Sequence, residues 1–411
     1  MKKPALALIW LVLAAVGVVG VYQRLTTGHE LAAYGSYIPW GLWVASYIYF
    51  IGLSAGAFLL SAVVYIGQVK QLKPLGPLAL FTALCTLVMA LLSIWFDLGH
   101  MFRAWEVILR PNFRSMMAWM VWLYSAYFLL LTVETVLALV EPTRPWLDRP
   151  GVRGAVARAL GGISVDTART WVRRLALVGV PLAIAFHGGV GALFGTVGAQ
   201  PFWHSGLVPI LFLTGALVSG AALLLAVYWL VWPVRDDAFR ATTRLLGTIL
   251  LGLLCFDIIL EWAEFSIPLW NSNSHEVEVF HAVTSGPYWW NFWIIHLLLG
   301  TIIPLILLVT RRTRPGALAL AGLLIAVTFL SVRLNIVIPP LTFPQIEGLQ
   351  EAYLSPHLEF SYLPSAFEWM VVAFVVATGS ALFAIGTAVL PLLPTAHSTG
   401  DAPVAREAHH A

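Results

Sequence analysis

An acid, a histidine and an arginine occur at three-residue spacing in the segment WFDLGHMFRAW, residues 95–105. If a helix continues through this segment, Asp97, His100 and Arg103 lie on one of its faces. A carboxylate beside an imidazole can accept the two protons that a quinol releases on oxidation, and a nearby arginine keeps the acid ionised. The alternative is a polar cap at a membrane surface, in which Asp97 is simply the partner of Arg103. The spacing leaves both interpretations open.

Two further histidines stand within apolar sequence, His187 in AFHGGVG and His296 in WIIH. Both are expected at similar depth, in the outer half of their helices. Two such imidazoles could ligate a b-type haem, because neutral imidazole is a common iron ligand. His187 could instead face a quinone, and either ring could bond a neighbouring helix. These alternatives stay open at the level of sequence.

Acidic side chains also interrupt the apolar sequence. Asp257, Glu261 and Glu264 are spaced by four and three residues, which predicts one stripe along a helix. The other polar groups expected inside helices of the second half are Arg333, Asn335 and Glu368. We expect these groups to converge, because an unpaired charge in lipid is costly. They form either a structural ion-pair network or a proton path. Glu134 stands alone in an earlier helix, either as a protonated structural group or as a stepping stone for protons.

Ten apolar stretches position these residues, and each is long enough to cross a bilayer, which takes about 20 residues. They are 5–22, 41–66, 75–96, 117–140, 172–195, 206–232, 244–264, 287–310, 316–338 and 364–391. The chain is 60% hydrophobic and only 10% charged. The runs are too long for barrel strands, and helices close their backbone hydrogen bonds internally. The sequence therefore predicts an all-α, polytopic integral membrane protein with about ten transmembrane helices.

The basic residues predict the orientation. Assigning the loops alternately places 18 of the 23 lysines and arginines on the side of the N-terminus. By the positive-inside rule both termini are cytoplasmic, in the cytoplasmic membrane of a bacterium or archaeon. The net charge of +3 then reflects topology and gives no indication of nucleic-acid binding. Residues 395–411 are predicted to form a disordered cytoplasmic tail.

We expect one transmembrane domain over residues 1–394. Small-residue runs at 52–57 and 215–221 permit close helix packing and occupy similar places in two halves of the chain. They predict two related four-helix bundles, about 41–195 and about 206–338. Flanking helices at 5–22 and 364–391 complete the domain.

Two cysteines, Cys85 and Cys255, are too few for an iron–sulfur cluster, which normally takes four cysteine ligands. The sequence also shows no zinc-ligand spacing and no phosphate-cradling glycine loop. We therefore expect no metal site and no cluster in this chain. Redox or transport chemistry must use a diffusible membrane molecule, a haem held by histidines, or partner subunits.

An ordered set of segments over residues about 35–390 resembles the NrfD-like family of membrane subunits. The family is typified by the polysulfide reductase membrane subunit and includes related ten-span hydrogenase membrane subunits. The segments are Trp40–Trp43 with Gly52–Leu60; Asp97–Gly99 followed by Pro111–Trp119; His187–Phe194; Pro201–Trp203; Arg333–Asn335; and Tyr362–Ser365 with Glu368.

This resemblance implies a quinone-binding subunit without haem, with the quinone near the outer side of the first bundle. Carried over to this sequence, it points to Asp97, His100 and His187, with Arg103 alongside. Tyr47 and Tyr49 are expected only as wall residues. The family commonly has a different residue at the position of His100, which weakens that assignment.

The resemblance also implies partners on the outer face. A ferredoxin-like iron–sulfur protein would dock there and connect to a catalytic subunit, usually with a molybdopterin cofactor. The expected function is a quinol-oxidising or non-catalytic membrane anchor of a respiratory oxidoreductase, using menaquinone or ubiquinone. Proton translocation would use Glu134, Asp257, Glu261, Glu264, Arg333 and Glu368. A haem b cytochrome and a secondary transporter are the alternative functions.

Overall fold

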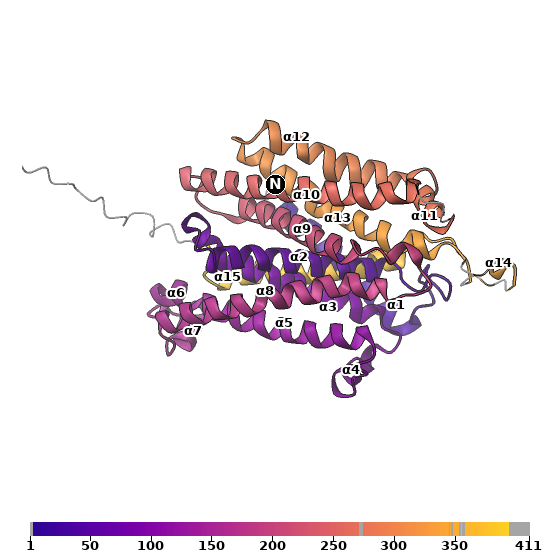
Figure 1. Ribbon diagram of the computed structural model, residues 1–411. Helices are drawn as coiled ribbons and strands as arrows, with labels where there is room; N and C mark the ends of the chain where they lie inside the picture. Colours follow the sequence, from indigo (N-terminus) through magenta and orange to yellow (C-terminus); the bar gives the residue numbers. More distant parts are fainter. Residues whose placement is uncertain are drawn as a thin grey trace, which may run out of the picture.

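The computed structural model describes residues 3–270, 274–344, 346, 348–352, 355 and 358–393 of the chain. Throughout these ranges the regular elements are helices, which confirms the all-α prediction (Figure 1). Ten of the described helical segments are long and apolar enough to cross a membrane, as the sequence predicted. The expected tail at 395–411 lies outside the described residues.

The long helices follow the predicted apolar stretches closely. They are α1 (Lys3–Thr27), α2 (Leu42–Tyr65), α3 (Gly76–Asp97), α5 (Met116–Ala138), α8 (Val165–Gly195), α9 (Val208–Val231), α10 (Asp237–Trp270), η5 (Asn291–Ile302) with α12 (Ile303–Thr310), α13 (Pro315–Leu341) and α15 (Ala366–Val389). Helix η5 is a π-helix and continues directly into α12, so the two make one span. Helix α1 is longer than the expected 5–22, and Arg24, expected in a loop, lies within it.

Short helices make up most of the connections. They are η1 (Lys70–Leu75), η2 (Met101–Arg103), α4 (Trp105–Leu109), α6 (Val140–Thr143), η3 (Arg144–Trp146), α7 (Val152–Leu160), η4 (Pro201–Trp203), α11 (Ser274–Thr284) and α14 (Leu349–Ala352). Side-chain caps stabilise the N-terminal ends of two of the long helices, α8 and α15. The Ser164 hydroxyl accepts a hydrogen bond from the backbone of Thr167, and Ser365 with Glu368 forms a capping box.

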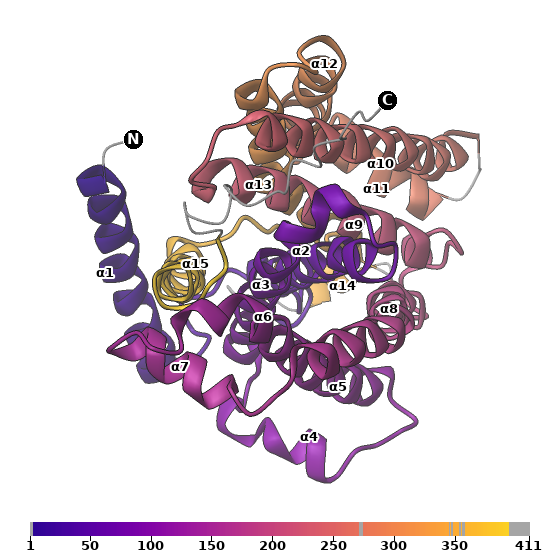
Figure 2. The same cartoon turned by 90° about the vertical axis from the view of Figure 1, so that its left-hand side faces the viewer.

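Helix α2 lies at the centre and is buried along most of its length (Figure 2). It packs against α3 and α8 of the first half of the chain, and against α9 and α13 of the second half. Helix α1 packs on α15 at the edge and is exposed along most of its length. The domain limit at residue 394 and the relatedness of the two bundles stay predictions.

Small residues bring the two halves of the chain together at α2 and α9. A Cβ atom added at Gly56 would lie 1.9 Å from the carbonyl oxygen of Ala216, and one at Gly220 would lie 2.5 Å from the backbone nitrogen of Ala57. No side chain fits at such distances, so the two backbones touch directly. This contact holds the central helix of the first half against the second half.

The two ends of the bundle differ in charge. Figure 1 shows α6 and α7 at one end, and α4, α11 and α14 at the other. We call the first the basic end, because its loops carry most of the lysines and arginines, and the second the opposite end. The basic residues of the basic end include Lys70, Lys73, Arg144, Arg149, Arg153, Arg158, Arg235, Arg240, Arg311, Arg312 and Arg314. Charge asymmetry of this kind predicts that the basic end faces the cytoplasm.

Reporter fusions at Pro111 and Arg153 test this orientation. Pro111 lies at the opposite end and Arg153 at the basic end, so an enzyme reporter active only outside the cytoplasm should be active at Pro111 and silent at Arg153. A reporter active only in the cytoplasm is the control and should give the reverse result. Reporters that place both positions on one side of the membrane would refute the ten-span topology.

Candidate functional site

The helix that carries Asp97 ends at that residue, so the expected continuation through His100 and Arg103 is wrong. Leu98 is extended, with ψ of 129°, and Gly99 and His100 are exposed. Arg103 instead forms an ion pair with Glu106, with 2.9 Å between Nε and Oε1. The one-face arrangement therefore does not form, and Arg103 is not the partner of Asp97.

Arg24, a buried arginine of α1, is the cation that interacts with Asp97 in place of Arg103. The Arg24 guanidinium donates hydrogen bonds of 2.8 Å to the carbonyl oxygens of Phe96 and Leu98, which ties α1 to the end of α3. Its charge interacts with Asp97. The Oδ1 atom of Asp97 is buried and has no hydrogen-bond partner among the described residues. Asp97 is thus held beside a cation with one carboxylate oxygen still available.

His29 and Tyr34 extend this group. Arg24 also contacts Nε2 of His29 at 2.8 Å, and Nδ1 of His29 lies 2.5 Å from the Tyr34 hydroxyl. A guanidinium can only donate, so Nε2 accepts and the ring proton is on Nδ1, which donates to Tyr34. The Tyr34 hydroxyl hydrogen is then free for another acceptor. This network can orient a phenol as a hydrogen-bond donor.

Electrostatics keep this imidazole neutral. Burial lowers the pKa of His29, and the charge of Arg24 lowers it further. Burial also raises the pKa of Tyr34, and the negative charges of Asp97 and Glu368 add to that effect. Tyr34 therefore stays a protonated phenol, and His29 acts as the group that positions it.

Glu368 belongs to this end of the molecule, so the expectation that it joins the other acids of the second half is wrong. It accepts hydrogen bonds from the Tyr362 hydroxyl at 2.5 Å and from the backbone of Ala33 and Ser365 at 3.1 and 2.9 Å. Gly41 makes room for it, because a Cβ there would lie 2.8 Å from Oε1 of Glu368. We call Arg24, His29, Tyr34, Asp97 and Glu368 the Asp97 cluster.

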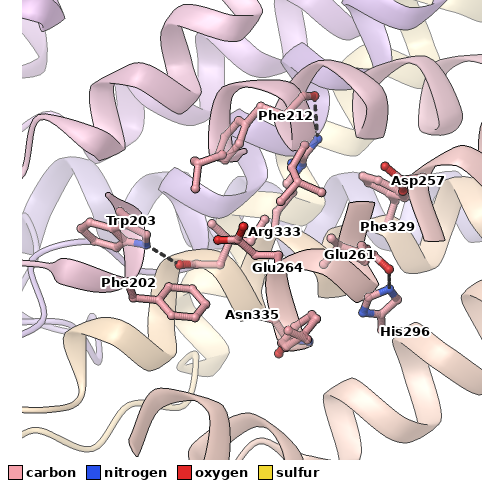
Figure 3. Close-up of a pocket in the computed structure, with 15 residues that line it drawn as sticks. Phe202, Trp203, Phe212, Asp257, Glu261, Glu264, His296, Phe329, Arg333 and Asn335 are labelled. Carbon is pink, nitrogen blue, oxygen red and sulfur yellow. Dashed lines mark hydrogen bonds and ion pairs between the residues drawn. The ribbon is translucent and has the colours of Figure 1, made fainter. Parts of the chain in front are cut away.

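A second polar site is a cavity between α9, α10, η5 and α13 (Figure 3). The acids of the predicted stripe line it, together with a histidine, an arginine and several aromatic rings. These residues include Asp257, Glu261, Glu264, His296, Arg333, Asn335, Phe202, Phe212, Phe265 and Phe329. Of the groups that the sequence analysis expected to converge, five line this cavity, namely Asp257, Glu261, Glu264, Arg333 and Asn335. We call this site the acid cavity.

Each acid of this cavity has a partner. Nε2 of His296 lies 3.2 Å from Glu261, as the dashed line in Figure 3 shows. Thr214 donates a hydrogen bond of 2.9 Å to Asp257, and Ser205 one of 2.8 Å to Glu264. His296 lies within the π-helix η5, a rare conformation that is frequent at functional sites. The stripe therefore runs from mid-membrane toward the opposite end.

Arg333 lies where the acid cavity meets the first half of the chain. Its guanidinium is stacked between the rings of Phe212 and Phe329, with centroid distances of 4.8 and 5.1 Å. It donates a hydrogen bond of 3.3 Å to the carbonyl oxygen of Phe212. His187, from α8, also lies near Phe212, with 6.3 Å between their ring centroids. His187 thus neighbours Arg333 and is not among the contacts of the Asp97 cluster.

The remaining predicted residues lie inside the first half of the chain. The Tyr47 hydroxyl bonds that of Tyr124, and the Tyr49 hydroxyl donates to the carbonyl oxygen of Ala326 at 2.6 Å. Glu134 is fully buried, and neither carboxylate oxygen has a hydrogen-bond partner among the described residues. A role for Tyr47, Tyr49 or Glu134 in a site stays a prediction.

Sequence reasoning missed Arg24, His29 and Tyr34. Arg24 was expected in a loop because the apolar run ends at residue 22, whereas α1 continues by one turn and more. One feature of the sequence could have drawn attention to Arg24 and His29. They are two basic side chains five residues apart, directly after an apolar run. Their meeting with Asp97, however, depends on α1 packing against the end of α3, which no local pattern reveals.

The ten candidate spans and the helical elements define a polytopic all-α membrane protein. The family model described as "Polysulphide reductase, NrfD" matches residues 30–345. The chain belongs to this family, which confirms the resemblance seen in the sequence.

Named relatives cover nearly the whole chain. A selenate reductase subunit of Mesobacillus selenatarsenatis is 36% identical, with 92% of each chain covered. The Hdr-like menaquinol oxidoreductase integral membrane subunit of Archaeoglobus fulgidus is 28% identical, with 93% of each covered. The menaquinone reductase integral membrane subunit of Nitratidesulfovibrio vulgaris is 23% identical, covering 92% of this chain and 89% of that one.

The neutral state of His29 predicts a pH dependence of stability. Because its pKa is lower in the folded protein, protonation near the ordinary value of about 6.5 favours the unfolded chain. The melting temperature should therefore fall between about pH 7.5 and about pH 5.5, and the fall should be smaller in His29→Gln. The exposed His100→Gln variant is the control and should follow the unmodified protein. An equal fall in His29→Gln would show that His29 is not the titrating group.

Proposed function

We propose that this chain is the quinone-binding membrane anchor of a respiratory oxidoreductase complex. It exchanges electrons between the quinone pool and an iron–sulfur subunit outside the cytoplasm. The observation that carries the proposal is the Asp97 cluster, which combines an available carboxylate oxygen, a neutral imidazole and an oriented phenol at the opposite end. The relatives named for menaquinol and menaquinone chemistry support it and favour menaquinone as the quinone.

Quinol oxidation releases two protons and two electrons. Asp97 accepts the two protons one after the other and releases each before taking the next, because Oδ1 has no other partner among the described residues. The Tyr34 hydroxyl, fixed by His29, donates a hydrogen bond to a quinone oxygen and so orients the ring. His100 is exposed just beyond the helix end and can pass protons to water. Both protons leave at the opposite end, and the electrons leave to the partner.

The electrons need an acceptor on another chain. Two cysteines are too few for a cluster in this chain, and the resemblance to the NrfD-like family implies a ferredoxin-like iron–sulfur subunit as the acceptor, connected to a molybdopterin-type catalytic subunit. The relative named as a selenate reductase subunit supports a multi-subunit arrangement. A haem between His187 and His296 is disfavoured, because Nε2 of His296 is engaged with Glu261.

The docking surface is the loop around α4, which projects from the opposite end (Figure 1). Its large apolar side chains are exposed, with Phe102 and Leu109 each 71% exposed and Trp105 51%. Exposed aromatic residues beside arginines are characteristic of protein interfaces. This surface lies at the same end as the Asp97 cluster, as electron transfer requires.

Replacing Asp97 with Asn tests the site. The amide keeps the shape but cannot accept a proton, so quinol oxidation by the assembled complex should fall by at least about 10²-fold. Asp237→Asn makes the same change on an exposed side chain at the basic end, away from the proposed docking surface, and is the matched control, which should keep normal turnover. Normal turnover in a correctly assembled Asp97→Asn complex would move the site elsewhere.

Reversing charges in the α4 loop tests the docking surface. Arg110→Glu combined with Arg114→Glu should release the iron–sulfur subunit during purification, because interface charges steer and hold the partner. The same reversal at Arg311 and Arg312, at the basic end, should leave the complex intact. Cross-links from basic-end loops to the iron–sulfur subunit would contradict the arrangement.

A further inference from the structure

We infer that the buried polar groups of the two halves form one proton path, which begins at Glu134 in the first half and crosses at His187 into the acid cavity. The inference rests on the proposed function, because quinol oxidation supplies its driving force. Glu134 lies toward the basic end, in the last turns of α5, whereas the acid cavity lies in the second half and is lined by residues of α9, α10, η5 and α13.

The first section of the path runs along α2 and α5. Glu134 is fully buried, and its two unpartnered oxygens need hydrogen-bond donors, which water can supply. Its charge interacts with the phenols of Tyr65 and Tyr127. Tyr127 is about 10 Å further along α5 and faces Ser54, with 3.3 Å between the hydroxyl oxygens. Hydroxyl groups donate and accept at once, so this line can relay protons.

The next section continues by one helical turn toward the opposite end. Tyr124 lies one turn beyond Tyr127, and its hydroxyl bonds that of Tyr47. The ring of Phe186 packs on both α5 tyrosines, with centroid distances of 5.4 and 4.5 Å. The ring of Phe186 also lies 6.1 Å from that of His187, the next residue of α8, so the tyrosine line and His187 both border Phe186.

The crossing point is marked by unpartnered nitrogens. His187 is fully buried and Arg333 is 1% exposed, yet Nδ1 and Nε2 of His187 and Nε of Arg333 have no hydrogen-bond partner among the described residues. Gly215 makes room here, because a Cβ there would lie 2.9 Å from Nη2 of Arg333. Gly52 faces both groups, since a Cβ there would lie 3.5 Å from Cε1 of His187 and 3.7 Å from Nη2 of Arg333.

Buried polar atoms are costly without partners, so three of them at one place indicate bound water. Water between His187 and Arg333 gives a proton a route from the tyrosine line to the second half. The neutral imidazole can accept a proton on one nitrogen and release it from the other.

The last section is the acid cavity. The Arg333 charge interacts with Asp257 and Glu261, which places the entry to the stripe next to the crossing. Glu261 is paired with His296, and Glu264 is the last acid before the opposite end. The transported proton is taken up on the Glu134 side and released beside Glu264. The two quinol protons leave separately at the Asp97 cluster, so net charge moves across the membrane.

A single path in series makes a sharp prediction for proteoliposomes that contain the assembled complex. Tyr127→Phe in the first half and Glu261→Gln in the second half should each lower the membrane potential formed during turnover by at least about tenfold. Quinol oxidation should persist in both variants, because neither residue belongs to the Asp97 cluster. Tyr228→Phe is the matched control, since it removes the hydroxyl of a buried tyrosine outside the path and should leave the potential unchanged.

Other outcomes overturn the inference. Two independent paths would leave part of the potential in each single variant and abolish it only in the double variant. An unchanged potential in both single variants would make these groups structural, and loss of quinol oxidation in both would assign them to the redox site. If the unmodified complex does not oxidise quinol, the proposed function itself fails. Should Tyr127→Phe not assemble, Ser54→Ala removes the facing hydroxyl and tests the same step.

Discussion

Charge that is buried in hydrocarbon must be neutralised or solvated, and two buried arginines organise how this protein meets that requirement. Arg24 is 4% exposed and binds the carbonyl oxygens at the end of α3, where its charge also interacts with Asp97. Arg333 is stacked between two phenylalanine rings, and its charge interacts with Asp257 and Glu261 of α10. The helices therefore pack around cations as well as around apolar surface.

These two centres differ in what they offer chemically. The Asp97 cluster holds a carboxylate oxygen without a described partner next to an imidazole that burial and Arg24 keep neutral. The acid cavity holds carboxylates that are already paired with hydroxyl groups or with His296. An unpaired base suits a substrate that delivers protons, whereas a line of paired acids suits proton relay. This difference is the reason for placing the quinone at the first centre and transport at the second.

Much of this arrangement could be predicted from the sequence, because it follows from local periodicity. The expected span 364–391 appears as α15 (Ala366–Val389), and Asp257, Glu261 and Glu264 form the stripe that their spacing indicated. Charges placed on one helix face need only the helix itself to bring them together. The errors arose where the outcome depends on distant contacts. The helix through Asp97 stops because Leu98 becomes extended and its carbonyl oxygen is bound by Arg24, 74 residues earlier, and no local spacing reveals that contact.

Photolabelling with an azido-quinone shows directly whether the quinone headgroup binds at the Asp97 cluster. The complex would be labelled during turnover and its peptides mapped by mass spectrometry, with excess unlabelled quinone as competitor. We expect competed labels between residues 29 and 43 and around Asp97. Competed labels confined to α10 and α13, which line the acid cavity, would contradict the placement of the quinone.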